Sequence, residues 1–196
     1  MPPEPPPVDF QTHALSKYRG AIAEGYDAKR ETSEKWLTED RLVKDMLADL
    51  PEGSWILDCP VGTGRFLPYY AEKKWLVRAL DASDDMLNQA IKKAGPGGLH
   101  VWFGLANILD SRVWSKSVDA AVMVRLSRWL SPPEFVVALR ELQRIARKRI
   151  VFTARVRNHV HTRDYEMIRS ALNGWHIARD EAGADQDYRI IALEPD

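Results

Sequence analysis

The sequence predicts an α/β fold: a single doubly wound domain on a mostly parallel seven-stranded sheet with an antiparallel C-terminal hairpin. Two observations predict this class. Beyond residue 50, short apolar runs alternate with segments whose apolar residues recur at helical spacing, which is typical of a parallel sheet covered on both faces. Only residues 181–187 separate the last two apolar runs. That is too short for a crossover helix, so these two strands are expected to pair antiparallel.

The chain divides into three consecutive parts. Residues 1–9 are rich in proline and are expected to form an extended, disordered tail. Residues 10–50 are expected to form N-terminal helices, over 10–30 and 33–50, that pack on the core. The buried face of the second helix should hold Trp36, Leu37, Leu42, Met46 and Leu47. Residues 51–196 are then the domain that carries the sheet.

Seven apolar runs are the expected strands of that sheet. They lie near 54–59, 75–81, 100–105, 118–124, 149–155, 175–181 and 187–194. A helix from Arg65 to Lys73 should follow the first strand. Ser83 should cap the next helix, which runs through Lys93 and is ended by the glycines that begin at Gly95.

A further helix is expected after the fourth strand, where Ser131 and Glu134 match a capping box with proline at the first helical position. Its inward residues should be Phe135, Val136, Leu139, Leu142 and Ile145. We expect the helix to end in the basic run 147–149, because cations suit the negative end of the helix dipole.

The composition narrows the class of protein. A chain of 196 residues suits one domain with a single substantial core. The 28 basic and 28 acidic side chains balance, so no overall field attracts nucleic acid or anionic lipid. The single cysteine, Cys59, excludes an internal disulfide. No apolar run is long enough to cross a membrane and no secretory signal begins the chain, so a cytoplasmic location is expected.

A glycine turn after the first strand is the clearest functional signal. Gly62 and Gly64 let backbone N–H groups approach a ligand closely, at the start of the following helix. Asp81 ends the second strand, where a carboxylate binds a ribose diol in nucleoside sites. Leu67 stands where a dinucleotide fingerprint has its third glycine, which argues against NAD or FAD. The pattern predicts a site for another nucleoside cofactor.

Four segments resemble the motifs of one family, the class I S-adenosylmethionine-dependent methyltransferases. Residues 58–66, Asp-Cys-Pro-Val-Gly-Thr-Gly-Arg-Phe, look like the family's first motif, and residues 80–87 look like its second. Residues 118–124 resemble its fourth strand, and residues 131–134 resemble the start of the next helix. The resemblance implies a Rossmann-like fold, S-adenosylmethionine as cofactor and methyl transfer as activity, and says little about the methyl acceptor.

The resemblance also implies which residues lie at the cofactor. Asp58 would orient the turn and the cofactor's amino-acid end; the alternative is that it caps the turn's own N–H groups. Arg65 would meet the methionine carboxylate; the alternative is a solvated side chain. The full expected set is Asp58, Pro60, Gly62, Gly64, Arg65, Asp81, Ala82, Met86, Ala106, Asn107 and Arg125.

The third motif departs from the family pattern. The family usually has an acid after the third strand that accepts a hydrogen bond from the adenine amino group. Here either Leu105 or Asn107 falls at that position, depending on the register. We favour Asn107, because its amide oxygen can still accept while Leu105 would stay buried.

Four residues are candidates for the acceptor side of the site. Tyr18 and Tyr26 resemble the tyrosines that close over cofactor or acceptor in this family; the alternative is plain packing of a helix on the sheet. Arg125 follows the fourth strand, at the edge where open α/β sheets bind ligands, and should also meet an acidic or polar group of the acceptor. Trp129 should line the acceptor pocket, unless it is core.

No fixed catalytic residue can be read from the sequence. His159 and His161 are candidates for a proton acceptor, and Tyr26 is a third candidate. The alternative for the two histidines is an exposed loop. Their spacing also suits a metal pair, but no further ligand is placed to complete it, so no metal is expected.

The expected function is methyl transfer from S-adenosylmethionine to a small-molecule oxygen or nitrogen. DNA is not an expected partner, because residues 124–127 lack the base-binding run of DNA amino-methyltransferases. Two alternatives stay open: methylation of a protein or RNA, and a non-catalytic S-adenosylmethionine-binding regulator. A macromolecular acceptor would use the basic residues Lys148, Arg149, Arg155, Arg157 and Arg163. A homodimer is also left open.

Overall fold

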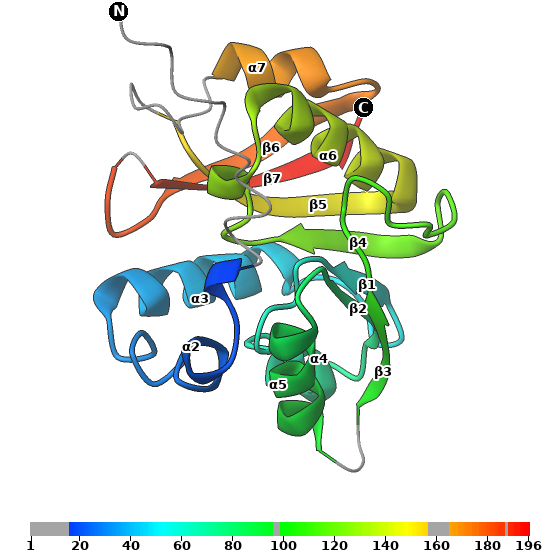
Figure 1. Cartoon of the computed structure of the whole chain (residues 1–196). Coiled ribbons are helices and arrows are strands. Elements are labelled where there is room, and N and C mark those ends of the chain that lie inside the picture. Colours follow the sequence, from blue (N-terminus) through cyan, green and yellow to red (C-terminus); the bar gives the residue numbers. More distant parts are fainter. Residues whose placement is uncertain (1–15, 96–98, 157–164, 187) are drawn as a thin grey trace, which may run out of the picture.

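The computed structural model describes residues 16–95, 99–156, 165–186 and 188–196, and it shows a seven-stranded sheet with helices on both faces (Figure 1). The strand order is β3-β2-β1-β4-β5-β7-β6. The strands are β1 (Trp55–Asp58), β2 (Leu76–Asp81), β3 (His100–Leu105), β4 (Val118–Met123), β5 (Ala146–Arg155), β6 (Trp175–Ala182) and β7 (Tyr188–Pro195). The predicted doubly wound α/β class is confirmed.

The sheet is parallel from β3 through β5, whereas β7 runs antiparallel to both β5 and β6. The predicted antiparallel C-terminal hairpin is therefore confirmed. The strand order reverses between β1 and β4, which lie side by side. Ligands of open α/β sheets bind outside the carboxyl ends of the strands at such a switch point. A ligand site is therefore expected at the carboxyl ends of β1 and β4.

Helices cover the two faces unequally. The helices are α2 (Ala21–Glu24), α3 (Glu34–Leu47), α4 (Leu67–Glu72), α5 (Asp84–Ala94), α6 (Pro132–Ile145) and α7 (Tyr165–Ala171), with a 3-10 turn, η1 (Ser127–Trp129). Figure 1 shows α6 and α7 on one side of the sheet and α3, α4 and α5 on the other. One apolar core cluster lies on each side.

The predicted helix starts are confirmed by their capping geometry. The Ser33 hydroxyl accepts from the Trp36 N–H at 3.3 Å, and the Ser83 hydroxyl accepts from the Met86 N–H at 3.4 Å. Ser131 and Glu134 form the expected capping box at the start of α6. These reciprocal bonds satisfy N–H groups that have no partner within the helix.

The N-terminal helices differ from the prediction. Of the predicted helix over 10–30, the described part is helical at residues 16–17 and in the four residues of α2, and it forms turns over residues 25–32. Gly20 and Gly25 bracket α2, and glycine is a poor helix former. On α3, Leu37 is 56% exposed rather than buried, and Glu39 is fully buried instead. The proline-rich tail over 1–9 lies outside the described residues.

The end of α6 also differs. The helix stops at Ile145 and the chain enters β5 at once, so residues 147–149 belong to a strand rather than to a helix end. Arg147 and Lys148 pair with Asp119 on the neighbouring β4, at 3.4 and 3.1 Å. Cross-strand pairing with this carboxylate replaces the predicted interaction with the helix dipole.

Gly64 shows why the turn after β1 needs a second glycine. Its φ is +76°, and a Cβ there would lie 2.6 Å from Leu67 Cδ1 and 3.1 Å from Ala90 Cα. Ala90 belongs to α5, so the glycine permits the close approach of α5 to the turn. Gly64 is not among the residues that line the pocket described below. The structure gives Gly64 a role in packing, and its contact with the cofactor stays a prediction.

We expect Gly64→Ala to lower the free energy of unfolding by about 3 kcal/mol, measured by urea denaturation. Gly53→Ala is the matched control, because Gly53 has a similar φ of +79° with no atom within 4 Å of an added Cβ. The control should cost only the backbone strain, about 1 kcal/mol. Equal losses in the two variants would contradict the packing role.

Candidate functional site

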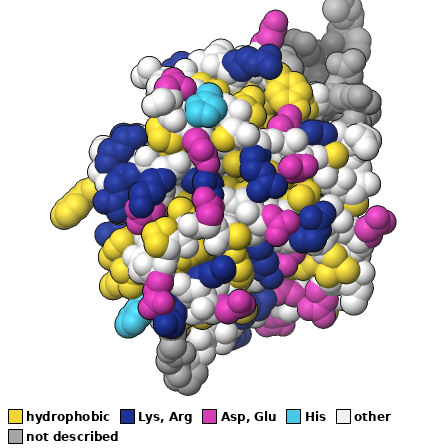
Figure 2. Space-filling view, turned by 180° about the vertical axis from the view of Figure 1, so that it is seen from behind, with side chains coloured by type: hydrophobic (Ala, Val, Ile, Leu, Met, Phe, Trp, Pro, Cys, Tyr) yellow, Lys and Arg dark blue, Asp and Glu magenta, His cyan; other side chains and the backbone are white. Residues whose placement is uncertain are grey.

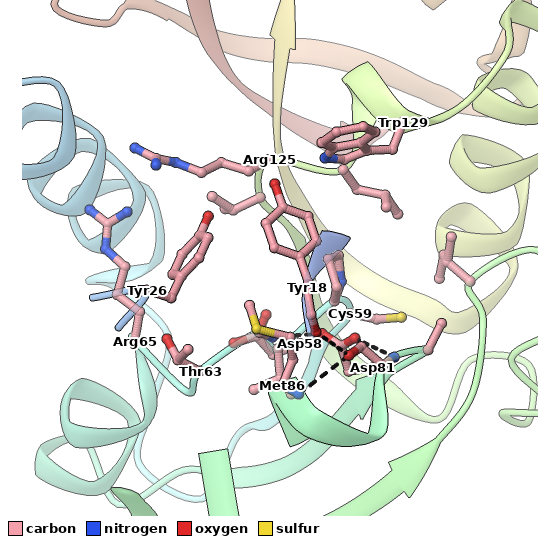
Figure 3. Close-up of a pocket in the computed structure, with 18 of the residues that line it drawn as sticks. Tyr18, Tyr26, Asp58, Cys59, Thr63, Arg65, Asp81, Met86, Arg125 and Trp129 are labelled. Atoms are coloured by element: carbon pink, nitrogen blue, oxygen red, sulfur yellow. Dashed lines mark hydrogen bonds between the residues drawn. The ribbon is translucent and has the colours of Figure 1, made fainter. Parts of the chain in front are cut away.

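A pocket opens at the carboxyl ends of β1, β2 and β4 (Figure 3). Its floor is the turn after β1, and its sides are the segments that follow β2, β3 and β4. Its outer wall is formed by Tyr18 and Tyr26, from the N-terminal segment (residues 16–32), and by Trp36, from α3. Every predicted cofactor residue except Gly64 lines this pocket: Asp58, Pro60, Gly62, Arg65, Asp81, Ala82, Met86, Ala106, Asn107 and Arg125.

The N-terminal segment is tied down over the pocket by polar contacts. Asp27 accepts from the Thr63 hydroxyl at 2.6 Å and pairs with Lys93. The Ser83 hydroxyl donates to the Tyr18 carbonyl at 3.0 Å. These contacts join the segment to the turn after β1 and to α5, so Tyr18 and Tyr26 are held at the pocket by the surrounding structure.

Asp81 is the central polar group of the pocket floor. Its carboxylate accepts from the Gly62 N–H and from the Ser83 N–H, both at 2.8 Å, and its residue is only 6% exposed. Burial raises the pKa of Asp81, although the backbone N–H groups around it act in the opposite direction. A carboxylate offers about four acceptor positions, so acceptor capacity remains for ligand hydroxyls.

Asp58 lies deeper, under the turn. It is 1% exposed and accepts a hydrogen bond from the Tyr70 hydroxyl at 3.2 Å. Burial, with a smaller effect from the charge of Asp81, raises the pKa of Asp58 to about 8, so the group is mostly protonated at neutral pH. The alternative that Asp58 caps the turn is wrong for Gly62, whose N–H donates to Asp81 instead.

Glu39 joins two arginines of the pocket wall. Its side chain is fully buried and accepts from Arg65 Nη1 at 2.5 Å, from Arg125 Nε at 2.8 Å and from the Tyr188 hydroxyl. The side chain of Arg65 is only 9% exposed, so the solvated alternative is wrong. Each Arg65 nitrogen already donates, to Asp40, Glu39 or the Trp36 carbonyl. This geometry disfavours Arg65 as a ligand of the methionine carboxylate.

Arg125 has an unusual backbone conformation. Its φ is +62°, a region that non-glycine residues seldom adopt, and its N–H donates to the buried Thr153 hydroxyl at 2.8 Å. Such strain persists where surrounding contacts hold it, often at functional sites. Here the strained residue sits where β4 ends, and its side chain enters the pocket wall.

The third motif differs in two respects from the prediction. Asn107 lines the pocket as expected, but its amide oxygen accepts from the Leu109 N–H at 3.1 Å within its own turn. Leu105 is 63% exposed rather than buried, because β3 is the edge strand of the sheet. Leu105 is not among the residues that line the pocket, and Asn107 as the partner of the adenine amino group stays a prediction.

The aromatic candidates come together at the mouth. The Tyr18 ring lies 5.6 Å from that of Tyr26 and 5.8 Å from that of Trp129, in edge-to-face geometry in both cases. Trp129 is 8% exposed, so it both lines the pocket and packs in the structure. His159 and His161 lie outside the described residues. Among the residues that are described, no group of three or more His, Cys, Asp or Glu is arranged to hold a metal.

Sequence reasoning missed Glu39, Trp36 and Thr63 as parts of the site. A signal for Glu39 was available: it lies three residues from Trp36 and from Leu42 on the apolar face of α3, where an unpaired carboxylate would be costly. Thr63 lies between the two glycines of the turn, and its partner Asp27 is 36 residues away. Pairings of that kind depend on the tertiary fold.

Comparison with known proteins agrees with this geometry. Residues 56–149 match a family model described as a methyltransferase domain. The resemblance of the sequence motifs to the class I S-adenosylmethionine-dependent methyltransferases is therefore confirmed. No curated protein sequence matches the chain.

Solved structures, among them methyltransferases, share the fold at low sequence identity. Magnesium protoporphyrin IX methyltransferase from Synechocystis, with bound S-adenosylmethionine, has a TM-score of 0.79 and 16% identity, covering 98% of this chain and 100% of that one. The 1,6-didemethyltoxoflavin-N1-methyltransferase of Burkholderia thailandensis has a TM-score of 0.70 and 15% identity, covering 98% and 92%. The cyclase SpnF has a TM-score of 0.75 and 15% identity, covering 96% of each chain.

The residues that line the pocket fit S-adenosylmethionine. The buried Asp81 carboxylate has acceptor capacity for a ribose, the Gly62 backbone leaves room above the turn, and Met86 and Ile108 give apolar walls. Cys59 is buried beside them, and burial raises the pKa of its thiol well above the usual range, so it stays a thiol rather than a nucleophile.

The raised pKa of Asp58 predicts a pH dependence of stability. Because the folded state holds this proton to about pH 8 and the unfolded state loses it near pH 4, the folded state binds more protons between these values. Stability should therefore fall as pH rises from about 4 to 8. Asp58→Asn, which keeps an acceptor for Tyr70, should flatten this slope in urea denaturation from pH 5 to 8. An unchanged slope would contradict the buried, protonated state.

Proposed function

We propose that this protein transfers the methyl group of S-adenosylmethionine to an oxygen or nitrogen atom of a small molecule. The observation that carries the proposal is the aromatic wall of the pocket, formed by Tyr18, Tyr26, Trp36 and Trp129, beside the buried Asp81 carboxylate. A small planar molecule fits walls of this kind, whereas a folded protein surface does not reach between them. The toxoflavin and protoporphyrin enzymes named above also carry small-molecule names.

The proposed mechanism relies on positioning. Bound S-adenosylmethionine supplies an activated methyl group on a sulfonium. Asp81 would hold the ribose, and the turn at Gly62 would carry the amino-acid end near Asp58. The aromatic mouth would orient the acceptor and exclude water, and proximity of this kind can supply most of the rate enhancement. Tyr26, His159 and His161 stay predictions for a proton acceptor.

The alternative of a protein or RNA acceptor is less well supported. The described members of its basic cluster each pair with carboxylates: Lys148 with Asp119, Arg149 with Asp49 and Glu194, and Arg155 with Asp185. Figure 2 shows acidic side chains interspersed among the basic ones over the face it draws. Interspersed charges of this kind do not make the basic groove that a nucleic acid backbone needs.

The third class, a protein that binds the cofactor without methyl transfer, is kept as an outcome of the test. SpnF is named as a cyclase although it shares this fold, so the fold alone does not decide the reaction. The homodimer and the cytoplasmic location stay predictions. No helix in the described ranges is long and apolar enough to span a bilayer.

Incubation with methyl-labelled S-adenosylmethionine and a cell extract tests the proposal directly. The extract is sorted afterwards into small-molecule, protein and RNA fractions, and we expect the label in the small-molecule fraction. Label in protein or RNA would favour the macromolecular alternative. Tight cofactor binding in calorimetry with no label transferred would favour the non-catalytic one.

Asp81→Ala should weaken binding of S-adenosylhomocysteine by about tenfold or more in calorimetry, because hydrogen bonds to a buried carboxylate contribute about 1.5–3 kcal/mol each. Asp81→Asn, which keeps one acceptor oxygen, should lose less. The thermal stability of both variants is measured separately, since Asp81 also holds the Gly62 and Ser83 N–H groups. Affinity within about twofold of the parent would show that Asp81 does not hold the ribose.

A further inference from the structure

Three cations lie against two of the aromatic rings at the mouth of the pocket. Arg30 lies 3.9 Å above the Tyr26 ring, and Arg128 lies 4.9 Å from the Trp129 ring. Lys17 approaches the same Trp129 ring to 5.4 Å. Positive charge beside the opening of a pocket favours the approach of anions.

The rings themselves form a continuous row across the mouth. Trp129 contacts Tyr18, Tyr18 contacts Tyr26, and Tyr26 contacts Trp36, with centroid separations of 5.8, 5.6 and 6.3 Å. Adjacent rings in this row are tilted or edge-to-face. A row of aromatic side chains offers faces and edges to a flat ligand ring, which favours a planar acceptor over a flexible chain.

Arg125 lies at one end of this row with part of its guanidinium uncommitted. Its Nε donates to Glu39 at 2.8 Å, and its Cζ lies 5.0 Å from the Trp36 ring. Among the described residues, its two Nη groups have no hydrogen-bond partner. In Figure 3 the guanidinium lies on the far side of Tyr26 from Asp81.

Glu39 fixes this orientation and leaves the charge incompletely neutralised. One buried carboxylate is shared between the guanidinium groups of Arg65 and Arg125. Since Nε of Arg125 is held, the planar fork formed by its two Nη groups is set in advance. A fork of this kind matches the two oxygens of a carboxylate. Glu39 is thus a positioning residue for Arg125.

We infer that the acceptor is a planar aromatic molecule bearing a carboxylate, with the carboxylate bound by the Nη groups of Arg125 and the ring lying along the row Trp129–Tyr18–Tyr26–Trp36. This inference rests on the proposed small-molecule methyl transfer and narrows its substrate class. The carboxylate end would face Arg125, so the ring atoms nearer Asp81 would lie toward the cofactor. The atom that is methylated therefore belongs to the end opposite the bound carboxylate.

The test compares 2-naphthoate with its neutral amide, 2-naphthamide, as matched probes of one ring shape. Binding to the full chain is followed by tryptophan fluorescence and calorimetry, with and without S-adenosylhomocysteine. We expect the carboxylate to bind about tenfold more tightly than the amide, as charge-assisted hydrogen bonds require. Equal binding of the two probes would overturn the inference.

Two substitutions locate the effect. Arg125→Gln should remove the preference for the carboxylate, whereas Arg112→Gln should keep it. Arg112 is the matched control because it also has a positive φ, +55°, but its side chain is 85% exposed and is not at the pocket. Arg125→Lys keeps the charge without the fork and should retain only part of the preference. If Arg125→Gln does not fold, an Arg125→Lys protein with the full preference of the parent overturns the inference.

The readouts separate this inference from the proposed function. A parent protein that fails to bind S-adenosylhomocysteine, yet prefers 2-naphthoate through Arg125, would contradict the proposed function and support the anion site. A parent protein that binds S-adenosylhomocysteine without distinguishing the two probes would support the proposed cofactor and contradict the anion site. Tighter binding of a short single-stranded RNA than of 2-naphthoate, lost in Arg125→Gln, would also overturn the small-carboxylate class.

Discussion

The arrangement of the pocket depends on one buried carboxylate, that of Asp81. It accepts one N–H from the turn after β1 and another from the cap of α5, so it fixes three segments at once: β2, the glycine turn and the helix start. Burying a carboxylate is costly, and these backbone donors offset part of that cost. Ser83 in turn donates from its hydroxyl to the Tyr18 carbonyl. The N-terminal segment is therefore connected to Asp81 through Ser83.

A second buried carboxylate organises the opposite end of the pocket. Glu39 comes from α3, outside the sheet, and reaches two arginines that follow β1 and β4, and also Tyr188 of β7. Removing one partner of such a buried ion pair is usually strongly destabilising, because the other charge stays desolvated. The turn after β1 is therefore held by both carboxylates, by Asp81 through Gly62 and by Glu39 through Arg65, whereas Arg125 is held by Glu39.

Much of the fold could be predicted from the sequence, because buried parallel strands are short apolar runs and because serine caps are local signals. Over residues 25–32 the predicted helix was wrong, since the chain forms turns there after Gly25. Leu105 was expected to be buried because the order of strands, which makes β3 an edge, cannot be read locally. The glycine turn and Asp81 were found from their spacing. The Glu39 network and the protonation of Asp58 were not, because both arise from contacts between distant segments.

The central claim is that Asp81 marks the ribose end of a cofactor site and that the aromatic row marks the acceptor end. A crystal structure of the chain with S-adenosylhomocysteine tests it most directly. The account predicts ribose hydroxyls within hydrogen-bond distance of the Asp81 carboxylate, with the sulfur facing the row formed by Tyr18, Tyr26 and Trp129. A ligand whose ribose lies away from Asp81, or whose sulfur faces open solvent, would contradict it.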